Sequence, residues 1–340
     1  MKKIFALVLV LVMALSLVSC GKEEYTLGMG VVVSTASSNG TNAQVDATVA
    51  AVVTDANGVI VACRIDVAQN KVDLTKSLEE IQATTFKTKM EKGDEYGMAG
   101  IIDNDHDGVM LEWYEQVHAF ENYVVGMTAD EVAAMRTQLV GGHYITTDAD
   151  LLNAGCSMQI TDFIQAVVKA CDDRNAVSFK ANPKKMTLGV AANTVANESD
   201  ATTVKMYSDF ACTVVVKGKI VAALNDAIQP SITVADGAVT GASYNGTKRE
   251  LRLAYNMTPA VNYGMDWNND GKVLEWYEQS AIFSAYVVGM TADEVDNMAT
   301  KEVEGHGYLI SADDALLSAG CTIQITAICD VVAEAVRNAR

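Results

Sequence analysis

The apolar residues of this chain recur at helical spacing in a stretch that the sequence contains twice. Residues 112–132 read EWYEQVHAFENYVVGMTADEV, and residues 275–295 read EWYEQSAIFSAYVVGMTADEV. In the first copy the large apolar residues follow one another at steps of four, three and four: Trp113, Val117, Phe120 and Val124. This spacing is one face of a helix, and the second copy keeps it except at Ser280. Such self-similarity indicates a duplicated structural unit.

Each copy also contains a stop signal and a second start signal. Gly126 and Gly289 predict the end of the helix, where the backbone must turn left-handed. Thr128 with Glu131, and Thr291 with Glu294, have the spacing of a capping box that begins a further helix. We therefore expect a helix, a glycine turn and a second helix in each copy.

Alternating and β-branched residues upstream of each copy predict strands. Ala47–Thr54 and Val59–Ile65 flank the turn Asp55–Gly58, and Ala211–Val216 and Lys219–Leu224 flank a Lys-Gly turn. A closing helix is expected after each helical pair, over Ile160–Cys171 and Ile325–Val336. Strands followed by helices indicate an α+β fold, a tandem duplication in which each unit has a small antiparallel sheet, a helical pair and a closing helix.

The matched segments divide the chain. Thr26-Leu27-Gly28 and Thr187-Leu188-Gly189 are corresponding starts. The sequence thus predicts a signal peptide (1–19), a tether (20–25), a first unit (26–173), a linker (174–186) and a second unit (187–340). The names first unit and second unit are kept for these ranges below.

The negative net charge disfavours some classes of partner. The chain has 340 residues and a formal net charge of −18. A nucleic-acid partner is disfavoured because phosphates are bound by Lys and Arg, and docking onto an anionic lipid surface by charge is disfavoured for the same reason.

The N-terminus predicts the location of the protein. Lys2 and Lys3 precede an apolar run that is too short to span a bilayer comfortably, and the run ends in Leu17-Val18-Ser19-Cys20. This end resembles the bacterial lipobox, which implies cleavage before Cys20 and attachment of diacylglycerol to its sulfur. The expected location is the extracytoplasmic face of the cell membrane. An ordinary secretory signal with a chance cysteine is the alternative.

The other cysteines do not have the spacing of a duplicated disulfide framework. Six remain besides Cys20, only Cys156 and Cys321 correspond between the units, and no CxxC occurs. A duplicated disulfide would have kept paired positions, so we expect free, mostly buried thiols.

Two Asp/Asn-rich loops obey the pattern D-x-[DN]-x-[DN]-G that opens a calcium-binding EF-hand loop. Their candidate Ca²⁺ ligands are Asp103, Asp105 and Asp107, and then Asp266, Asn268 and Asp270. Alternate side chains of a tight loop can direct several hard oxygens to Ca²⁺. At the twelfth position a tyrosine replaces the usual bidentate carboxylate. The alternative is a polar turn before a helix, where acidic residues are favoured.

A second duplicated constellation is a turn of small residues before each closing helix. Gly155 and Ser157 occupy it in the first unit, and Gly320 and Thr322 in the second. Exposed amides at a helix start can hold an anion such as phosphate. Equally, the glycine can make the turn while the hydroxyl caps the helix.

These segments together resemble a diverged pair of FMN-binding domains, such as those of the extracytoplasmic flavin-carrying subunits of sodium-pumping quinone reductases and ion-translocating ferredoxin oxidoreductases. The resemblance rests on the hairpins at Asn57–Val61 and Lys217–Val221 and on the turns Ala154–Ser157 and Ala319–Thr322. The helical pair is similar to that of uncharacterised clostridial-type lipoproteins.

The resemblance implies that FMN is the cofactor, with its phosphate esterified to Ser157 and Thr322 and its approach allowed by Gly155 and Gly320. It also implies a redox protein or a quinone as partner. Two functions are therefore open. One is an FMN-binding electron carrier, and the other is a non-enzymatic surface lipoprotein, stabilised by Ca²⁺, that binds a ligand or a protein partner. Hydrolase signatures such as G-x-S-x-G and HExxH do not occur.

Overall fold

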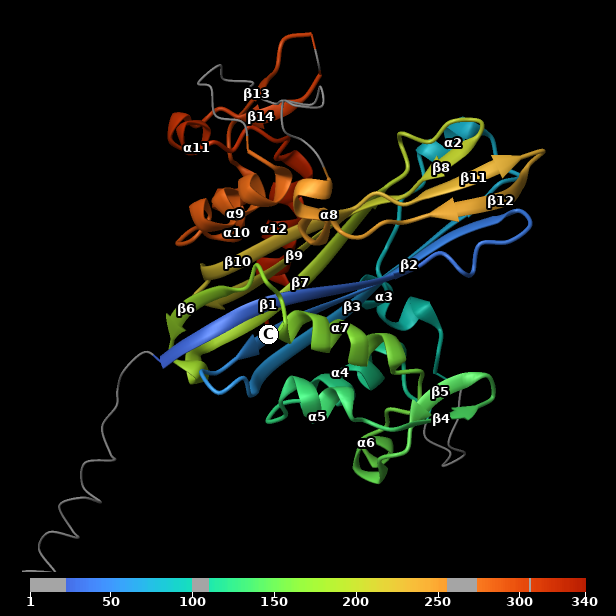
Figure 1. Cartoon of the computed structure of the whole chain (residues 1–340), viewed down its shortest axis with the longest axis vertical. Coiled ribbons are helices and arrows are strands. Elements are labelled where there is room, and N and C mark those ends of the chain that lie inside the picture. Colours follow the sequence, from blue (N-terminus) through green and yellow to red (C-terminus); the bar gives the residue numbers. More distant parts are fainter. Residues whose placement is uncertain (1–22, 100–109, 256–273, 306) are drawn as a thin grey trace, which may run out of the picture.

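The chain has an α+β fold in which antiparallel strands alternate with short helices. A computed structural model describes residues 23–99, 110–255, 274–305 and 307–340. The predicted α+β class is therefore confirmed for this part of the chain, and Figure 1 shows the arrangement of its elements.

The first unit supplies a long three-stranded meander followed by helices. Its strands and helices are β1 (Glu23–Ser34), β2 (Asn42–Thr54), β3 (Ile60–Asp73), α2 (Leu78–Gln82), α3 (Lys89–Lys92), the 3₁₀ helix η1 (Gly93–Tyr96), α4 (Trp113–Tyr123), α5 (Ala129–Ala133), β4 (Thr137–Val140), β5 (His143–Thr146), α6 (Ala149–Asn153) and α7 (Thr161–Cys171). β2 pairs with both β1 and β3, which confirms the predicted hairpin and lengthens both of its strands at the end away from the turn.

The second unit has a similar order of elements, but β8, β11 and β12 are additional and α2 has no counterpart among its described elements. Its elements are β7 (Met186–Val195), β8 (Thr203–Lys205), β9 (Tyr207–Val216), β10 (Lys219–Ile228), β11 (Ser231–Ala235), β12 (Ala238–Ser243), α8 (Lys248–Leu251), the 3₁₀ helix η3 (Arg252–Ala254), α9 (Trp276–Tyr286), α10 (Ala292–Asp296), β13 (Thr300–Glu302), β14 (Leu309–Ser311), α11 (Asp314–Ala319) and α12 (Thr326–Arg337). β8, β11 and β12 form a separate small sheet that the sequence did not predict.

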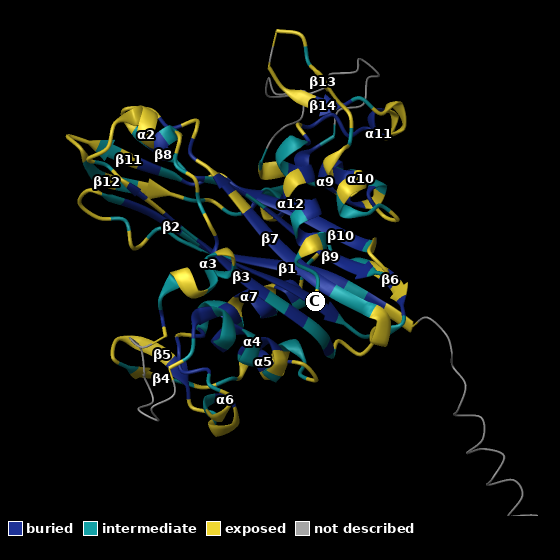
Figure 2. Ribbon diagram, turned by 180° about the vertical axis from the view of Figure 1, so that it is seen from behind, coloured by how far each residue is buried: buried dark blue, intermediate teal, exposed yellow. Residues whose placement is uncertain are grey.

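The two main sheets pack face to face. Their inward side chains form one shared core, to which β1 contributes Tyr25, Leu27, Met29 and Val31 and β7 contributes Leu188, Val190 and Ala192. The helices α4, α5 and α7 cover the outer face of the first sheet, and α9, α10 and α12 cover that of the second (Figure 1). The central strands are accordingly buried, whereas the peripheral hairpins are exposed (Figure 2).

Glycines on the outer faces of β1 and β7 set the distance of the closing helices. A Cβ placed on Gly28 would lie 1.9 Å from the carbonyl oxygen of Ala170 in α7, and one on Gly189 would lie 1.8 Å from that of Ala335 in α12. Any side chain would force the helix away from the sheet. The matching starts of the two units are therefore positions of helix–sheet contact.

The helical pair forms as predicted. The apolar face of α4 is buried, and Gly126 and Gly289 have φ values of +92° and +91°. Both capping boxes that begin α5 and α10 are present. Each glycine turn also donates a backbone hydrogen bond to a strand, from Gly126 to Ile60 and from Gly289 to Ile220.

Residues 174–186, predicted as a linker, contain strand β6 (Val177–Ala181) and the 3₁₀ helix η2 (Pro183–Lys185). β6 pairs with β1, so this segment is part of the first sheet. The pairing begins at Glu23, within the predicted tether. The six cysteines of the described residues are free, and five of them are buried. None of the described helices is long and apolar enough to cross a bilayer.

Candidate functional site

Several predicted site residues lie outside the described residues. These are the lipidation site Cys20 and the candidate Ca²⁺ ligands Asp103, Asp105, Asp107, Asp266, Asn268 and Asp270. Both roles stay predictions. Within the described ranges, no group of three or more His, Cys, Asp or Glu side chains is arranged to hold a metal ion.

The acidic residues at the starts of α4 and α9 have structural partners. Glu112 is 8 % exposed, and its carboxylate accepts hydrogen bonds from the amides of Met98 and Ala99. Glu115 and Glu278 reach back to the amides of Glu112 and Glu275, respectively. These carboxylates therefore hold backbone amides at and before the starts of the two helices.

The small-residue turn of the first unit is filled by a side chain of the same chain. Gly155 has φ +91°, and Ser157 is 3 % exposed. The amide of Ser157 donates to Oε1 of Gln116 at 3.0 Å, and Nε2 of that glutamine donates to the carbonyl of Leu111 at 3.0 Å. The side-chain oxygen of Gln116 thus occupies the position at which the predicted anion would accept this hydrogen bond.

The second unit has the same arrangement. Gly320 has φ +104°, Thr322 is 1 % exposed, and its amide donates to Oε1 of Gln279 at 2.7 Å. Nε2 of Gln279 donates to the carbonyl of Leu274 at 2.9 Å. Ser157 and Thr322 as described do not fit a phosphate cradle, because their amides are used and their side chains are buried. Flavin attachment there stays a prediction of the resemblance.

A pocket of about 290 Å³ lies beside this turn in the second unit. It is formed by the outer face of β9 and β10, by α8 and by the starts of α9 and α12, and it includes Ile323 and Gln324 next to Thr322. Four aromatic side chains line it: Tyr207, Tyr255, Trp276 and Tyr308. We call it the aromatic pocket.

A lysine is held over the aromatic rings of this pocket. Nζ of Lys248 lies 5.1 Å from the ring centre of Tyr255 and 5.2 Å from that of Trp276, which is cation–π geometry. The hydroxyl of Tyr255 donates to Oε1 of Gln229 at 3.0 Å. The rings and the ammonium are therefore fixed by contacts within the chain.

Lys248 is positioned by a buried carboxylate. Asp226 on β10 is 5 % exposed, and its Oδ1 accepts from the amides of Ala227 at 2.8 Å and Arg249 at 3.0 Å. Burial raises the pKa of Asp226 to about 6, opposed by the nearby Arg249 guanidinium. This carboxylate attaches the first turn of α8 to the sheet. Asp66 attaches α3 to the first sheet in the same way, because its Oδ1 accepts hydrogen bonds from the amides of Val67 and Met90.

Trp276 is positioned by the start of α9. It is the first residue of that helix, and the capping box between Glu275 and Glu278 fixes the backbone on its N-terminal side. The ring is 5 % exposed and packs in the outer core of the second unit. Trp276, which lies on the predicted apolar face of this helix, therefore also forms a wall of the pocket.

The first unit has the same arrangement of a lysine over two aromatic rings, but a phenylalanine occupies the space that forms the pocket in the second unit. Lys89 lies 4.8 Å from the ring centre of Tyr96 and 5.5 Å from that of Trp113. Phe163 packs edge-on against Trp113 with ring centres 6.1 Å apart. The register of the closing helices places Ile328 at the position of Phe163, and Ala327 at that of Asp162. The smaller residues of the second unit leave the space that forms the pocket.

The strands also differ at the pocket wall. The β1–β2 and β7–β9 registers align Tyr207 with Asp46 and Asp209 with Thr48. Burial raises the pKa of Asp209 above its ordinary value, and the Lys248 ammonium opposes that shift. The second unit therefore places a carboxyl, an ammonium and aromatic faces around one cavity.

Local sequence patterns did not reveal this site. They placed Trp113 and its counterpart Trp276 on the apolar face of a helix and did not single out Lys248. The available signal was the difference between the units at matched positions, where Phe163 becomes Ile328 and Thr48 becomes Asp209.

No family model matches this chain, and no curated protein or solved structure is significantly similar to it.

Proposed function

We propose that this protein is a lipid-anchored binding protein of the extracytoplasmic membrane face, and that its aromatic pocket binds a small ring compound bearing hydroxyl groups. The observation that carries the proposal is the combination of flat aromatic faces with mixed polar groups in one cavity of the second unit. The location rests on the lipobox resemblance at Cys20.

The ligand class follows from the chemistry of the lining. Trp276 and Tyr255 offer rigid apolar surfaces. Around them the carboxyl of Asp209 accepts, the ammonium of Lys248 donates, and the amide of Gln229 can do both. A hydroxyl group also donates and accepts, so a ring with an apolar face and hydroxyl edges, such as a monosaccharide, matches both features. The pocket volume of about 290 Å³ suits a single ring.

Flavin binding is the second candidate, and one observation favours it. The aromatic pocket adjoins the turn that carries Thr322, so an aromatic ring in the pocket would lie beside the predicted attachment residue. The buried hydroxyl of Thr322 weighs against covalent attachment without rearrangement.

One titration experiment separates these candidates. The mature protein would be titrated calorimetrically with glucose, galactose, N-acetylglucosamine and FMN. We expect saturable binding of at least one monosaccharide, and loss of that binding in Ala327→Asp/Ile328→Phe, which installs the first-unit residues. Ile328→Val is the matched control and should bind as the wild type does. Binding of FMN alone would favour the electron carrier, and no binding, or unchanged binding in the double variant, would refute the pocket assignment.

The membrane anchor is tested separately. Cys20→Ser removes the sulfur that lipid attachment requires, so we expect the protein to leave the membrane fraction of the host and to appear in the soluble extracytoplasmic fraction. Continued membrane association of this variant would contradict the lipoprotein assignment.

A further inference from the structure

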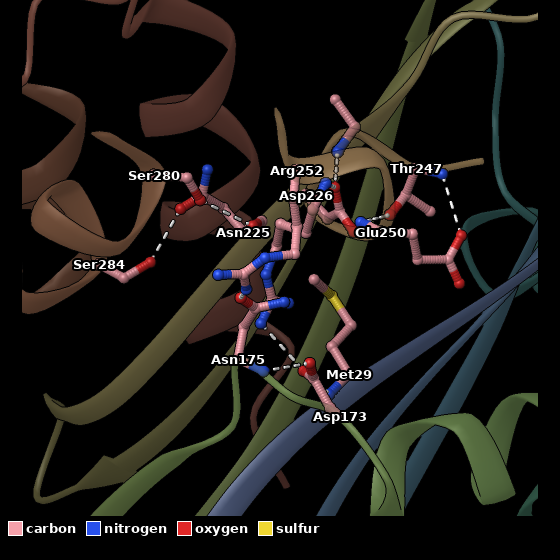
Figure 3. Close-up of polar contacts among 12 residues, drawn as sticks. Met29, Asp173, Asn175, Asn225, Asp226, Thr247, Glu250, Arg252, Ser280 and Ser284 are labelled. Carbon is pink, nitrogen blue, oxygen red and sulfur yellow. Dashed lines mark hydrogen bonds and ion pairs between the residues drawn. The ribbon is translucent and has the colours of Figure 1, made fainter. Parts of the chain in front are cut away.

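A second cavity lies between the two units and shares no lining residue with the aromatic pocket. It measures about 470 Å³ and is bounded by β1 and the end of α7 on one side and by β10, α8 and η3 on the other. Its lining includes four cations, Lys169, Arg174, Arg249 and Arg252. We call it the inter-unit cleft, and Figure 3 shows its polar contacts.

Most of the carboxylates in the cleft are already satisfied. Asp173 accepts from the amide of Met29 at 3.1 Å and from Nη2 of Arg249 at 3.0 Å, and this pair is almost fully buried (Figure 3). Glu250 accepts from the amide of Thr247 and from Nζ of Lys169. Arg249 and Lys169 are therefore neutralised within the protein.

Among the described residues, the partners of Arg252 are neutral. Its guanidinium carbon lies 4.1 Å from the ring centre of Tyr277. Its Nη1 donates to Oδ1 of Asn175 at 3.2 Å, and Figure 3 shows both residues. Arg174, on the same side of the cleft as Asn175, forms no ion pair with another described residue. Arg174 and Arg252 thus form no ion pair with a described residue, and Asp172 is a further carboxylate in the cleft lining.

The backbone at Arg252 is one that glycine adopts easily. Arg252 has φ +49° and ψ −122°, and Gly93, at the corresponding position of the first unit, has φ +48° and ψ −125°. A side chain in such a region strains the backbone. The cation–π stack of Arg252 on Tyr277 offsets part of that strain. Because the stack at best offsets the strain, fold stability alone does not account for an arginine here.

We propose that the inter-unit cleft binds a small molecule through an oxyanion, either a carboxylate or a phosphate group, held by Arg252 and Arg174. The planar guanidinium of Arg252 is pre-oriented by Tyr277 and Asn175, and such a fork binds oxyanions in a bidentate manner. The site is independent of the aromatic pocket. It joins Arg252 of the second unit to Arg174 of the predicted linker, so its ligand would also connect these two segments.

The chain offers a matched pair of variants for the test. Arg252→Gly restores the residue of the first unit and removes the guanidinium without backbone strain. Arg337→Gly removes one arginine at the last residue of α12, away from the cleft, where the side chain pairs with Asp296. Both change the net charge equally. Arg174→Ser is a further variant at an exposed position.

Calorimetric titrations would use sodium phosphate and sodium malonate at constant ionic strength, with sodium chloride as the reference. We expect one saturable site in the wild type and in Arg337→Gly, at least tenfold weaker binding in Arg252→Gly, and weaker binding in Arg174→Ser. The preferred probe identifies the oxyanion. The melting temperature of Arg252→Gly should equal or exceed that of the wild type. No saturable binding of either anion, or equal affinity in Arg252→Gly, would overturn the proposal.

Discussion

Replacing Gln279 with alanine tests the account of the small-residue turn. Gln279 is 1 % exposed and joins two backbone groups that are distant in sequence, the amide of Thr322 at 2.7 Å and the carbonyl of Leu274 at 2.9 Å. Alanine leaves both groups without these bonds. An unsatisfied buried group costs about 1–3 kcal/mol, so the two together predict a loss of about 2–6 kcal/mol in the free energy of unfolding. Gln116→Ala should cost a similar amount, since its two hydrogen bonds are both 3.0 Å long.

The assay is urea denaturation followed by tryptophan fluorescence, with the free energy obtained by linear extrapolation. Gln279→Glu separates the two hydrogen bonds, because a carboxylate still accepts from Thr322 but no longer donates to Leu274. Gln324→Ala is the control, since Gln324 is exposed beside the same turn, and it should change stability by less than about 0.5 kcal/mol. A loss in Gln279→Ala no greater than that of the control would refute the reasoning. It would reopen the turn as a site for an anion.

Three further predictions concern the sheets, pH and calcium. Gly189→Ala should lower the free energy of unfolding by about 1–3 kcal/mol or more, because its Cβ would lie 1.8 Å from the carbonyl oxygen of Ala335. Gly241→Ala is the control and should not lower it, because its Cβ would meet nothing nearer than 3.9 Å. Equal urea midpoints for the two variants would contradict this prediction. Burial raises the pKa values of Asp66 and Asp226 to about 6, so the native state holds these protons more tightly than the unfolded state, and stability should fall as pH rises from about 4 to 6. The double variant Asp66→Asn/Asp226→Asn should lose that part of the pH dependence in urea titrations at several pH values, and an unchanged profile would argue against it. If the Asp/Asn-rich loops bind Ca²⁺, adding Ca²⁺ after EDTA should raise the melting temperature, and identical melting in both conditions would exclude that role.

The helical pair could be predicted because its signals are local. The spacing of Trp113, Val117, Phe120 and Val124, the stop at Gly126 and the Thr-x-x-Glu capping box each involve residues within about one or two turns of helix. Such local preferences agree with the final packing, and the structure places the predicted face in the core. The hairpins followed from turn residues between β-branched runs for the same reason.

The candidate sites were harder to predict, because their meaning depends on residues far apart in the sequence. The turn at Ser157 has the composition of an anion cradle, and only its contact with Gln116, 41 residues earlier, shows that a side chain occupies it. Nothing local in the sequence marks Gln116 as buried. The same limit applies to Lys248 and Trp276, which the fold brings together across the second unit.

By itself, the sequence determined the α+β class, the helical pairs, the hairpins and the closing helices, since these follow from periodicity and turn chemistry. The tertiary structure decided that the two sheets share one core, that β6 of the predicted linker joins the first sheet, and that a cleft forms between the units. It also decided that a pocket is present beside Ile328 in the second unit, whereas Phe163 occupies the corresponding space in the first unit. The physical reason is that burial and cavity volume arise from side chains that meet only in the folded chain, so no single stretch of sequence encodes them.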